Sequence, residues 1–344
     1  DAGVHFTAIS GSGDRFLFPE IMMGGGALFD MEGDDDLDLV VAGTDEAVLM
    51  VKYDRSSQEL ADALTERYAY PFCRALSAEE TREYVATDDF LEGLYDPEAM
   101  TLHPLNYTLG IANAASDAGV RLFENSRVLS YSKTDPALVR TAQGSVKASH
   151  IVLACNGYLG NLEPRSAGKI MPINNFMVAT QPLGEERALE LINGRFGVHD
   201  TRFVVNYFRL SDDYRLLFGG GENYRPGFPR DIERFVRPYM LRMFPQLKDV
   251  NIDYAWGGTL AVTVNRLPHV GRLEPNVYFA QGYSGHGIST ATFAGKVIAE
   301  AIAGVAGRFD GLASLPTHTF PGGTHLRYPG MVLGMLYYGI KDRF

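Results

Sequence analysis

The stretch NVYFAQGYSGHGISTATFAGKVIAEAIA, residues 276–303, decides how the rest of this sequence is interpreted. Its apolar segment 276–281 predicts a strand, its glycines at 282–287 predict a tight turn, and the residues from Ile288 to Ala303 have the apolar spacing of a helix. Because glycine has no Cβ, a flat ligand can approach the backbone of such a turn closely. The start of the helix presents unpaired N–H groups and a positive dipole end, which would stabilise an electron-rich or anionic group.

Two interpretations of this stretch stay open. It is either a ligand-binding turn or simply the start of a helix, because strand–glycine–helix turns are frequent in α/β folds. A second signal is the continuous apolar run Ile151–Cys155, which is typical of a strand buried on both faces and which stops at Asn156-Gly157. Ligands of open α/β sheets bind at such carboxyl ends, although a plain core strand followed by a turn is the better explanation of this run taken alone.

A third signal is Trp256, the single tryptophan, which is followed by Gly257 and Gly258. A tryptophan beside paired glycines can pack on a ring system, but a buried tryptophan is more often part of a core. Downstream, residues 263–271 read TVNRLPHVG. Neither feature identifies a ligand by itself.

Composition excludes several classes of protein. The chain has 344 residues, of which 46% are hydrophobic and 21% charged, a balance typical of a globular protein with about two domains. A formal net charge of −11 makes nucleic acid an unfavourable partner, and no basic patch offsets it. Two cysteines are too few for a disulfide framework, so we expect a reducing, cytoplasmic location. No run of eighteen apolar residues predicts a membrane span.

The central part of the chain has clear local patterns. Pro104 can open a helix whose apolar residues share one face and which Gly119 ends. Strands are predicted at Val120–Phe123, Arg127–Tyr131 and Leu138–Thr141. Residues 170–256 alternate in the manner of antiparallel strands, with a helix at Ile232–Met243.

Other chemistries find little support in the sequence. The eight histidines show no metal-binding spacing and there is no CxxC pair, so we expect no metal site. The G-x-S-x-G elbow of many hydrolases is absent. A dinucleotide-type G-x-G-x-x-G is also absent from the first fifty residues. Because the first residue is Asp1, we expect a fragment or processed form of a longer protein.

Three motifs, taken together and in this order, resemble a known family: IVLACNGYLG at 151–160, NRLPHVG at 265–271 and QGYSGHG at 281–287. They resemble the FAD-dependent oxidoreductases of the D-amino-acid oxidase (DAO) type, and within them the gamma-glutamylputrescine oxidase branch. The C-terminal segments GMLYY at 334–338 and KDRF at 341–344 are similar to that branch as well. The resemblance spans about residues 52–344.

The resemblance implies a mixed α/β (α+β) fold with a three-layer FAD/NAD(P)-binding domain and an antiparallel-sheet substrate domain. Residues 51–165 and 257–310 would form the discontinuous FAD-binding domain, 166–256 the substrate domain and 311–344 a C-terminal tail. Residues 1–50 stay unassigned, because the N-terminal Gly-rich βαβ that the resemblance predicts has no match there. Without that segment the pyrophosphate of FAD would lack helix-end donors.

The resemblance also implies site residues. Val128 would contact the adenine side through its backbone, and Ala154, Cys155 and Gly157 would line the phosphates and the ribityl chain. The helix start would face the flavin ring, where it would stabilise the reduced, anionic flavin. The implied cofactor-binding residues are Val128, Ala154, Cys155, Gly157, Gly258, Gly285, His286, Gly287, Ile288 and Ser289. Candidates for the substrate-side wall are Tyr207, Tyr224 and Trp256. We assign no catalytic acid or base, and we expect neither Cys155 nor His286 to anchor a flavin covalently.

The function implied is FAD-dependent oxidation of a C–N bond in a small amine, such as an acylated polyamine of the gamma-glutamylputrescine type. The products would be an imine and, with oxygen as the second substrate, hydrogen peroxide. One alternative is a dehydrogenase that passes electrons to another acceptor. Another is a relative without its nucleotide-binding half that acts as a non-catalytic binding or assembly subunit. The missing glycine fingerprint motivates this last hypothesis.

Overall fold

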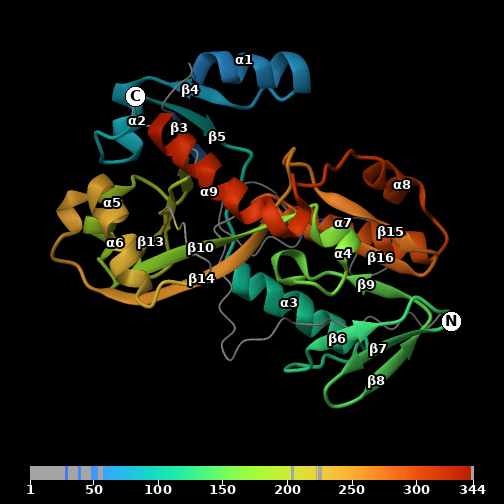
Figure 1. Cartoon of the computed structure of the whole chain (residues 1–344). Coiled ribbons are helices and arrows are strands. Elements are labelled where there is room, and N and C mark those ends of the chain that lie inside the picture. The colour runs from blue at the N-terminus through green and yellow to red at the C-terminus, as the bar shows by residue number, and fades with distance from the viewer. Residues whose placement is uncertain are drawn as a thin grey trace. The chain divides into compact units, whose positions relative to one another are not determined.

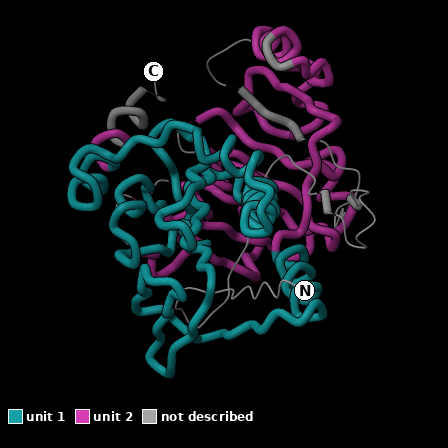
Figure 2. Tube along the Cα trace, turned by 90° about the vertical axis from the view of Figure 1, so that its right-hand side faces the viewer, with its two compact units in different colours: residues 1–16, 105–173, 259–331 teal, residues 17–104, 174–258, 332–344 magenta. Residues whose placement is uncertain are grey.

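The computed structural model describes residues 57–202, 205–221, 223 and 227–341, together with the short strands β1 (Leu28–Phe29), β2 (Asp38–Leu39) and β3 (Val48–Lys52). It divides into two compact units, which are described separately (Figure 2). Unit 1 contains residues 1–16, 105–173 and 259–331, and unit 2 contains residues 17–104, 174–258 and 332–344. Apart from β1 and β2, residues 1–47 of the segment left unassigned above lie outside the described residues.

The centre of unit 1 is a three-stranded sheet in the order β15 (His269–Glu274), β16 (Val277–Gln281) and β9 (Ile151–Leu153). β16 runs parallel to β9 and antiparallel to β15. Every residue of β16 is buried, because its alternate side chains pack on opposite faces of the sheet. The apolar segment 276–281 thus forms the predicted strand, and it is covered on both sides. The run Ile151–Cys155, predicted to be buried on both faces, forms a strand only over Ile151–Leu153, in which Val152 is half-buried.

The two faces of this sheet carry different covers (Figure 1). On one face Tyr278 and Ala280 pack with residues of α7 (Gly287–Ile302) and α8 (Gly307–Ala313). On the other face Val277 and Phe279 pack with residues of a meander formed by β6 (Val128–Tyr131), β7 (Ala137–Thr141) and β8 (Ser145–Ala148). Unit 1 is thus a three-layer arrangement of meander, sheet and helices.

Further helices belong to unit 1 in whole or in part, and α9 is divided between the units at residue 331. α3 (Pro104–Asp117) begins at the predicted proline, and Gly119 follows it with φ +90°. A hydrogen bond of 2.9 Å between the Tyr107 hydroxyl and Thr292 Oγ1 joins α3 to α7. A 3-10 turn (Asn156–Tyr158) and α4 (Pro164–Ala167) come after β9, and α9 (Gly323–Lys341) lies at the C-terminal end.

One sequence prediction in this region is wrong. No strand forms at Val120–Phe123: its last three side chains are exposed, and the segment pairs with no described strand. Apolar residues alone do not make a strand where no partner offers hydrogen bonds.

Unit 2 is built on an eight-stranded sheet, in which all described pairings are antiparallel except that of β11 with β3. Its order is β14 (Ile252–Val262), β10 (Met171–Thr180), β13 (Leu216–Gly219), β12 (Tyr207–Leu210), β11 (Gly197–Asp200), β3, β5 (Glu92–Asp96) and β4 (Arg74–Leu76). Its helices are α1 (Ser57–Tyr68), α2 (Ala78–Tyr84), α5 (Glu185–Leu191) and α6 (Ile232–Met243).

The core of unit 2 centres on Phe208. Its ring stacks with those of Phe90 and Phe218 and meets Phe244 edge-on, with centroids 5.0–6.4 Å apart. α6 begins where Asp231 accepts a 2.8 Å hydrogen bond from the amide of Arg234 and ends at the predicted Met243. The mixed α/β fold with an antiparallel sheet is therefore confirmed, whereas the domain boundaries taken from the sequence stay predictions.

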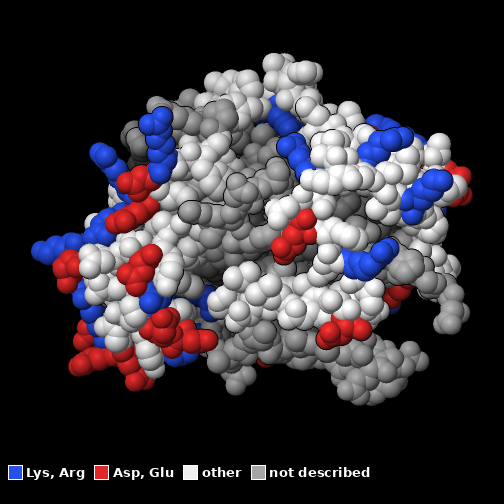
Figure 3. All heavy atoms as spheres, turned by 90° about the horizontal axis from the view of Figure 1, so that it is seen from below, with Lys and Arg blue, Asp and Glu red and all other residues white. Residues whose placement is uncertain are grey.

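Two further observations concern the distribution of charged side chains and the length and apolar content of the helices. On the face seen in Figure 3, acidic and basic side chains of the described residues are intermixed, and the basic ones do not gather into one patch. In the part of the chain that the structure describes, no helix combines the length and apolar content needed to cross a bilayer.

Candidate functional site

The two loops that the sequence singled out lie at the same edge of the unit 1 sheet. Because β9 and β16 are parallel and Leu153 is paired with Phe279, their carboxyl ends coincide. The residues that follow β9, Ala154 and Cys155, therefore lie at the edge where the 282–287 turn begins. This is where open α/β sheets bind ligands.

A side-chain hydrogen bond fastens the two loops together. Asn156 Oδ1 accepts a 2.9 Å hydrogen bond from the amide of Gly282. Both residues have positive φ, 44° and 72° respectively, a conformation that asparagine and glycine adopt more readily than other residues. The bond thus fixes the chain direction at the exit of both strands.

The middle of the turn is held against the end of β14. The amide of Ser284 donates to the carbonyl of Ala261 at 3.0 Å, and Ser284 Oγ accepts a 3.2 Å hydrogen bond from the amide of Thr263. Ser284 has φ 53°, so these bonds hold a non-glycine residue in the left-handed region. The turn is preorganised by the chain itself.

Gly157 packs backbone against backbone. A Cβ there would lie 2.5 Å from the carbonyl oxygen of Thr259 and 2.9 Å from that of Leu260. The neighbouring Tyr158 hydroxyl accepts a 2.9 Å hydrogen bond from the amide of Thr259. The glycine is therefore required by contact with β14, whatever else lies near it.

The start of α7 leaves its amides available. His286 occupies the position before the first helical residue and makes no capping hydrogen bond through its side chain. Gly285 has φ +101°, and a Cβ added to it would meet no heavy atom within 4 Å. A helix N-terminus therefore lies next to a residue with open space around it, and the amides of Gly287, Ile288 and Ser289 are the donors of its first turn.

Cys155 and His286, the two side chains considered for covalent attachment of a flavin, differ in burial. Burial raises the pKa of the Cys155 thiol, and this side chain packs on Leu159, Ala167, Ile170 and Ala261. A neutral, packed thiol is a poor nucleophile. His286 is exposed at the start of α7. The expectation that neither holds a flavin covalently stays a prediction.

The remaining predicted residues are dispersed. Val128 is half-buried at the start of β6, in the meander of unit 1. Gly258 and Trp256 lie in the part of β14 that belongs to unit 2, and Trp256 is half-buried. Tyr207 is buried in β12, and its hydroxyl donates to Asn175 Oδ1. Tyr224 lies outside the described residues. The structure thus brings together Ala154, Cys155, Gly157 and 285–289.

Sequence reasoning missed the residues that shape this edge. Asn156 had a usable signal, an Asn-Gly pair at the end of a buried strand, but it was interpreted only as a turn. Tyr158, Thr263 and Ser284 had no usable local signal, because their partners lie at least 21 residues away along the chain.

Comparison with known proteins gives one family and several relatives. The family described as FAD dependent oxidoreductase (DAO) matches residues 39–301. Gamma-glutamylputrescine oxidoreductase of Escherichia coli is 43% identical over 81% of this chain and 66% of its own length. The probable oxidoreductase OrdL of Rhizobium meliloti is 38% identical over 85% of this chain and 68% of its own length. The chain thus spans about two thirds of the length of these curated relatives.

Solved structures with the same fold are more distant in sequence. Glycine oxidase from Geobacillus kaustophilus superposes with a TM-score of 0.65 at 18% identity, covering 80% of this chain and 76% of that one. L-proline dehydrogenase from P. horikoshii superposes with a TM-score of 0.62 at 23% identity, covering 86% and 78%. At these identities the likeness describes the fold alone.

Proposed function

Because this chain belongs to the DAO family of FAD-dependent oxidoreductases, we propose that it binds FAD and oxidises the C–N bond of a small amine. The substrate we propose is gamma-glutamylputrescine or a similar acylated polyamine, on the strength of the 43% identity to gamma-glutamylputrescine oxidoreductase. FAD, when bound, supplies the acceptor for the hydride that leaves the carbon next to nitrogen. The imine that results is hydrolysed by water, and oxygen is reduced to hydrogen peroxide.

One observation carries the proposal: the uncapped start of α7 beside the open space at Gly285. A flavin ring is flat and gains negative charge on reduction, so it suits a glycine turn that no side chain covers. Residues 285–289 would hold the ring end of the cofactor, and Ala154 would lie beside the ribityl chain. Apart from the 282–287 turn itself, the described residues contain no glycine-rich turn between a strand and a helix that would suit the pyrophosphate, so this proposal concerns the ring end.

The roles of the chain's own residues follow from its geometry. The amides of Gly287, Ile288 and Ser289 would stabilise negative charge through hydrogen bonds and the helix dipole. The Asn156–Gly282 bond and the Ser284–Thr263 bond would keep those amides in place without reorganisation during the reaction. No acid or base is assigned.

The substrate-side wall would consist of aromatic side chains. We propose Trp256 and Tyr224 for aromatic contact with the amine, and Tyr207 through its ring, because its hydroxyl is engaged with Asn175. An aromatic wall suits an ammonium group through cation–π attraction.

The experiment compares two glycine substitutions in the purified chain supplied with FAD. Gly285→Ala should weaken FAD binding about 10-fold or more, because the methyl group enters the space assigned to the ring. Gly119→Ala is the matched control: its φ is +90° against +101°, it also has open space around Cβ, and it lies after α3, away from the turn. Flavin absorbance after gel filtration measures binding for both variants.

Activity is measured separately on the FAD-loaded chain. Anaerobic addition of gamma-glutamylputrescine should bleach the flavin absorbance, and air should restore it with formation of hydrogen peroxide. Bleaching without oxygen consumption would replace the oxidase with a dehydrogenase. A chain that takes up no FAD and forms no peroxide would favour the non-catalytic subunit, for which the missing G-x-G-x-x-G is the motivation.

A further inference from the structure

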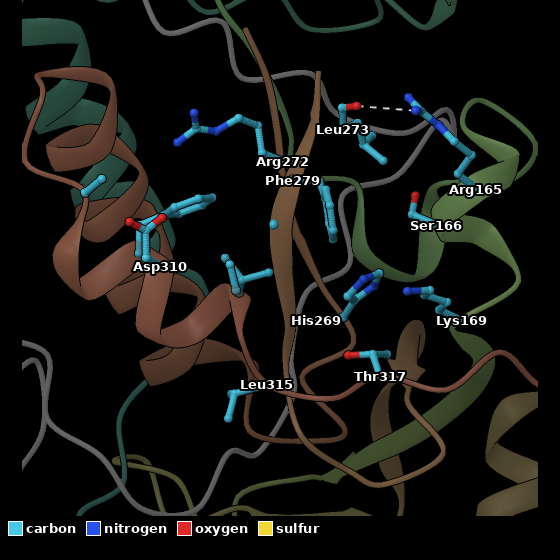
Figure 4. A pocket seen from close by; sticks show the side chains of 15 residues that line it. Arg165, Ser166, Lys169, His269, Arg272, Leu273, Phe279, Asp310, Leu315 and Thr317 are labelled. Atoms are coloured by element: carbon cyan, nitrogen blue, oxygen red, sulfur yellow. Dashed lines mark hydrogen bonds between the residues drawn. The ribbon is translucent and has the colours of Figure 1, made fainter. Parts of the chain in front are cut away.

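A cavity lies in unit 1 along the outer edge strand of the sheet. It has a volume of about 770 Å³ and runs along β15 between α4 and α8 (Figure 4). Phe279 of β16 and Phe309 of α8 contribute its apolar surface. None of the residues 282–289 lines it, so it is separate from the turn assigned to the flavin.

Buried His269 presents a hydrogen-bond donor with no partner. Gln281 Nε2 donates to the carbonyl oxygen of Ser166 at 3.0 Å and lies 3.1 Å from His269 Nδ1. A carbonyl only accepts, so this amide nitrogen is oriented as a donor and His269 Nδ1 must accept. The imidazole proton is therefore on Nε2, for which the described residues provide no acceptor, although the side chain is only 7% exposed.

Two further polar groups lie beside it. Thr317 Oγ1 is buried and forms no hydrogen bond within the described residues. Lys169 has no carboxylate partner there either, and Figure 4 shows its amine directed towards the His269 ring with Thr317 close by. A buried polar group without a partner is destabilising. The buried Thr317 Oγ1 lies at the same end of the cavity as two further donors, His269 Nε2 and the half-exposed Lys169 amine, so this end indicates a missing ligand.

The other charged side chains of the cavity indicate at which end the ligand binds. Arg165 is already paired with Glu163 and Glu274 at 3.2 and 3.1 Å. The Arg272 guanidinium stands over the rings of Tyr278 and Phe309. Asp310 lines the α8 side, where it would repel an anion. The end at Lys169 is therefore the cationic end of the cavity.

We propose that this cavity binds a small organic anion, whose carboxylate or phosphate is held by Lys169 Nζ, His269 Nε2 and Thr317 Oγ1. The organic part of the ligand packs on Phe279, whose ring lies 4.5 Å from that of His269. His269 acts as a neutral donor, since burial and the nearby Lys169 lower its pKa to about 4, and Lys169 supplies the charge. This site goes beyond the proposed oxidase activity and does not depend on it.

The test is isothermal titration calorimetry of the whole chain with three probes of similar size: phenyl phosphate, hexanoate and hexanol. Hexanoate and phenyl phosphate separate a carboxylate ligand from a phosphate ligand, and hexanol is the uncharged comparison. At least one anion should bind with a 1:1 stoichiometry while hexanol does not. Lack of binding by both anions at millimolar concentration would overturn the proposal.

Substitutions locate the site. Lys169→Gln and His269→Phe should each weaken binding about 10-fold or more, because each removes a donor to a charged group. His269→Gln, which keeps an N–H donor, should retain more affinity than His269→Phe. Lys147→Gln is the matched control, an exposed lysine of β8 in the same unit, and should leave binding unchanged.

Two results would contradict the assignment even if an anion binds. One is unchanged affinity in both Lys169→Gln and His269→Phe, and the other is an equal loss in Lys147→Gln. Urea unfolding of each variant shows that the fold is intact. Because no amine is turned over and no flavin absorbance is measured, a failure of the oxidase proposal leaves this result interpretable.

Discussion

At the residue scale, His269 gives the stability of unit 1 a defined pH dependence. Its pKa is lowered to about 4 in the folded chain, against about 6.5 in an unfolded one. Below pH 6.5 the unfolded chain takes up a proton that the folded chain refuses until about pH 4. The histidine therefore contributes no penalty above pH 6.5, and it removes roughly 3 kcal/mol of stability as the pH falls from 6.5 to 4.

The measurement is urea unfolding at several pH values for the wild type and His269→Gln. Carboxylates titrate in the same range in both proteins, so the difference between the two curves isolates the histidine. The wild type should lose stability more steeply than the variant between pH 6.5 and 4. Parallel curves would show that His269 can be protonated in the folded chain without penalty.

Substitution of glycine by alanine should have opposite effects on stability at Gly157 and at Gly110. Gly157→Ala places a methyl group 2.5 Å from a backbone oxygen of β14, which cannot move independently, so we expect a loss of about 2 kcal/mol. Gly110→Ala lies inside α3 with no heavy atom within 4 Å, and helix propensity predicts a gain of about 0.5–1 kcal/mol. Thermal unfolding of the two variants beside the wild type checks both signs.

At the scale of elements, the sequence predicted those strands and helices whose signal is local. β16 is a continuous apolar run that is buried on both faces, β9 is a shorter apolar run with only Val152 half-buried, and α6 has a capping residue directly before it. α7 was expected over Ile288–Ala303 and spans Gly287–Ile302. Each of these elements is specified by residues within a few positions of one another.

What the sequence could not provide is pairing between distant segments. Asn156 and Gly282 are 126 residues apart, and no periodicity links them. The parallel pairing of β11 with β3, in a sheet that is otherwise antiparallel in its described pairings, joins strands about 150 residues apart. Val120–Phe123 fails for the same reason, because a strand depends on a partner that its own residues do not specify.

A further prediction concerns the N–H group of Gly287, the first residue of α7. Proline is tolerated at the first position of a helix, so Gly287→Pro should leave the helix intact while removing one N–H donor from the turn. We expect FAD affinity to fall about 10-fold, with the free energy of unfolding changed by no more than about 1 kcal/mol. Gly307→Pro, at the first position of α8, is the control and should not change FAD affinity. Equal FAD retention in both variants would show that the Gly287 amide does not contact the cofactor.

At the scale of the whole molecule, the candidate flavin edge depends on segments spread over much of the chain. Residues 151–158, 259–263 and 282–289 meet only because the sheet of unit 1 brings strand ends together. β16, the 282–287 turn and α7 together correspond only to the part of a cofactor site that would hold the flavin ring. The amount of FAD that the purified chain retains therefore shows whether this part is enough to bind the cofactor.

The solvent exposure of the ion pairs predicts which of them contribute to the stability of the chain. The chain carries 42 acidic and 31 basic residues, and several of its ion pairs are exposed to solvent, where screening leaves little net energy. An exception in unit 2 is Arg202, only 12% exposed, which lies 2.6 Å from Asp89 and 2.7 Å from the fully buried carboxylate of Asp200. Asp200 also accepts hydrogen bonds from Asn206.

Arg202→Met should therefore destabilise the chain by about 3 kcal/mol, because it leaves the Asp200 carboxylate buried without its cation. Arg82→Met is the control: it removes the Arg82–Asp88 pair, whose side chains are 50% and 97% exposed, and should change stability by no more than about 0.5 kcal/mol. Urea unfolding measures both. The loss in Arg202→Met should shrink at low pH, since a protonated Asp200 no longer needs a cation, whereas a loss independent of pH would assign the effect of Arg202 to packing.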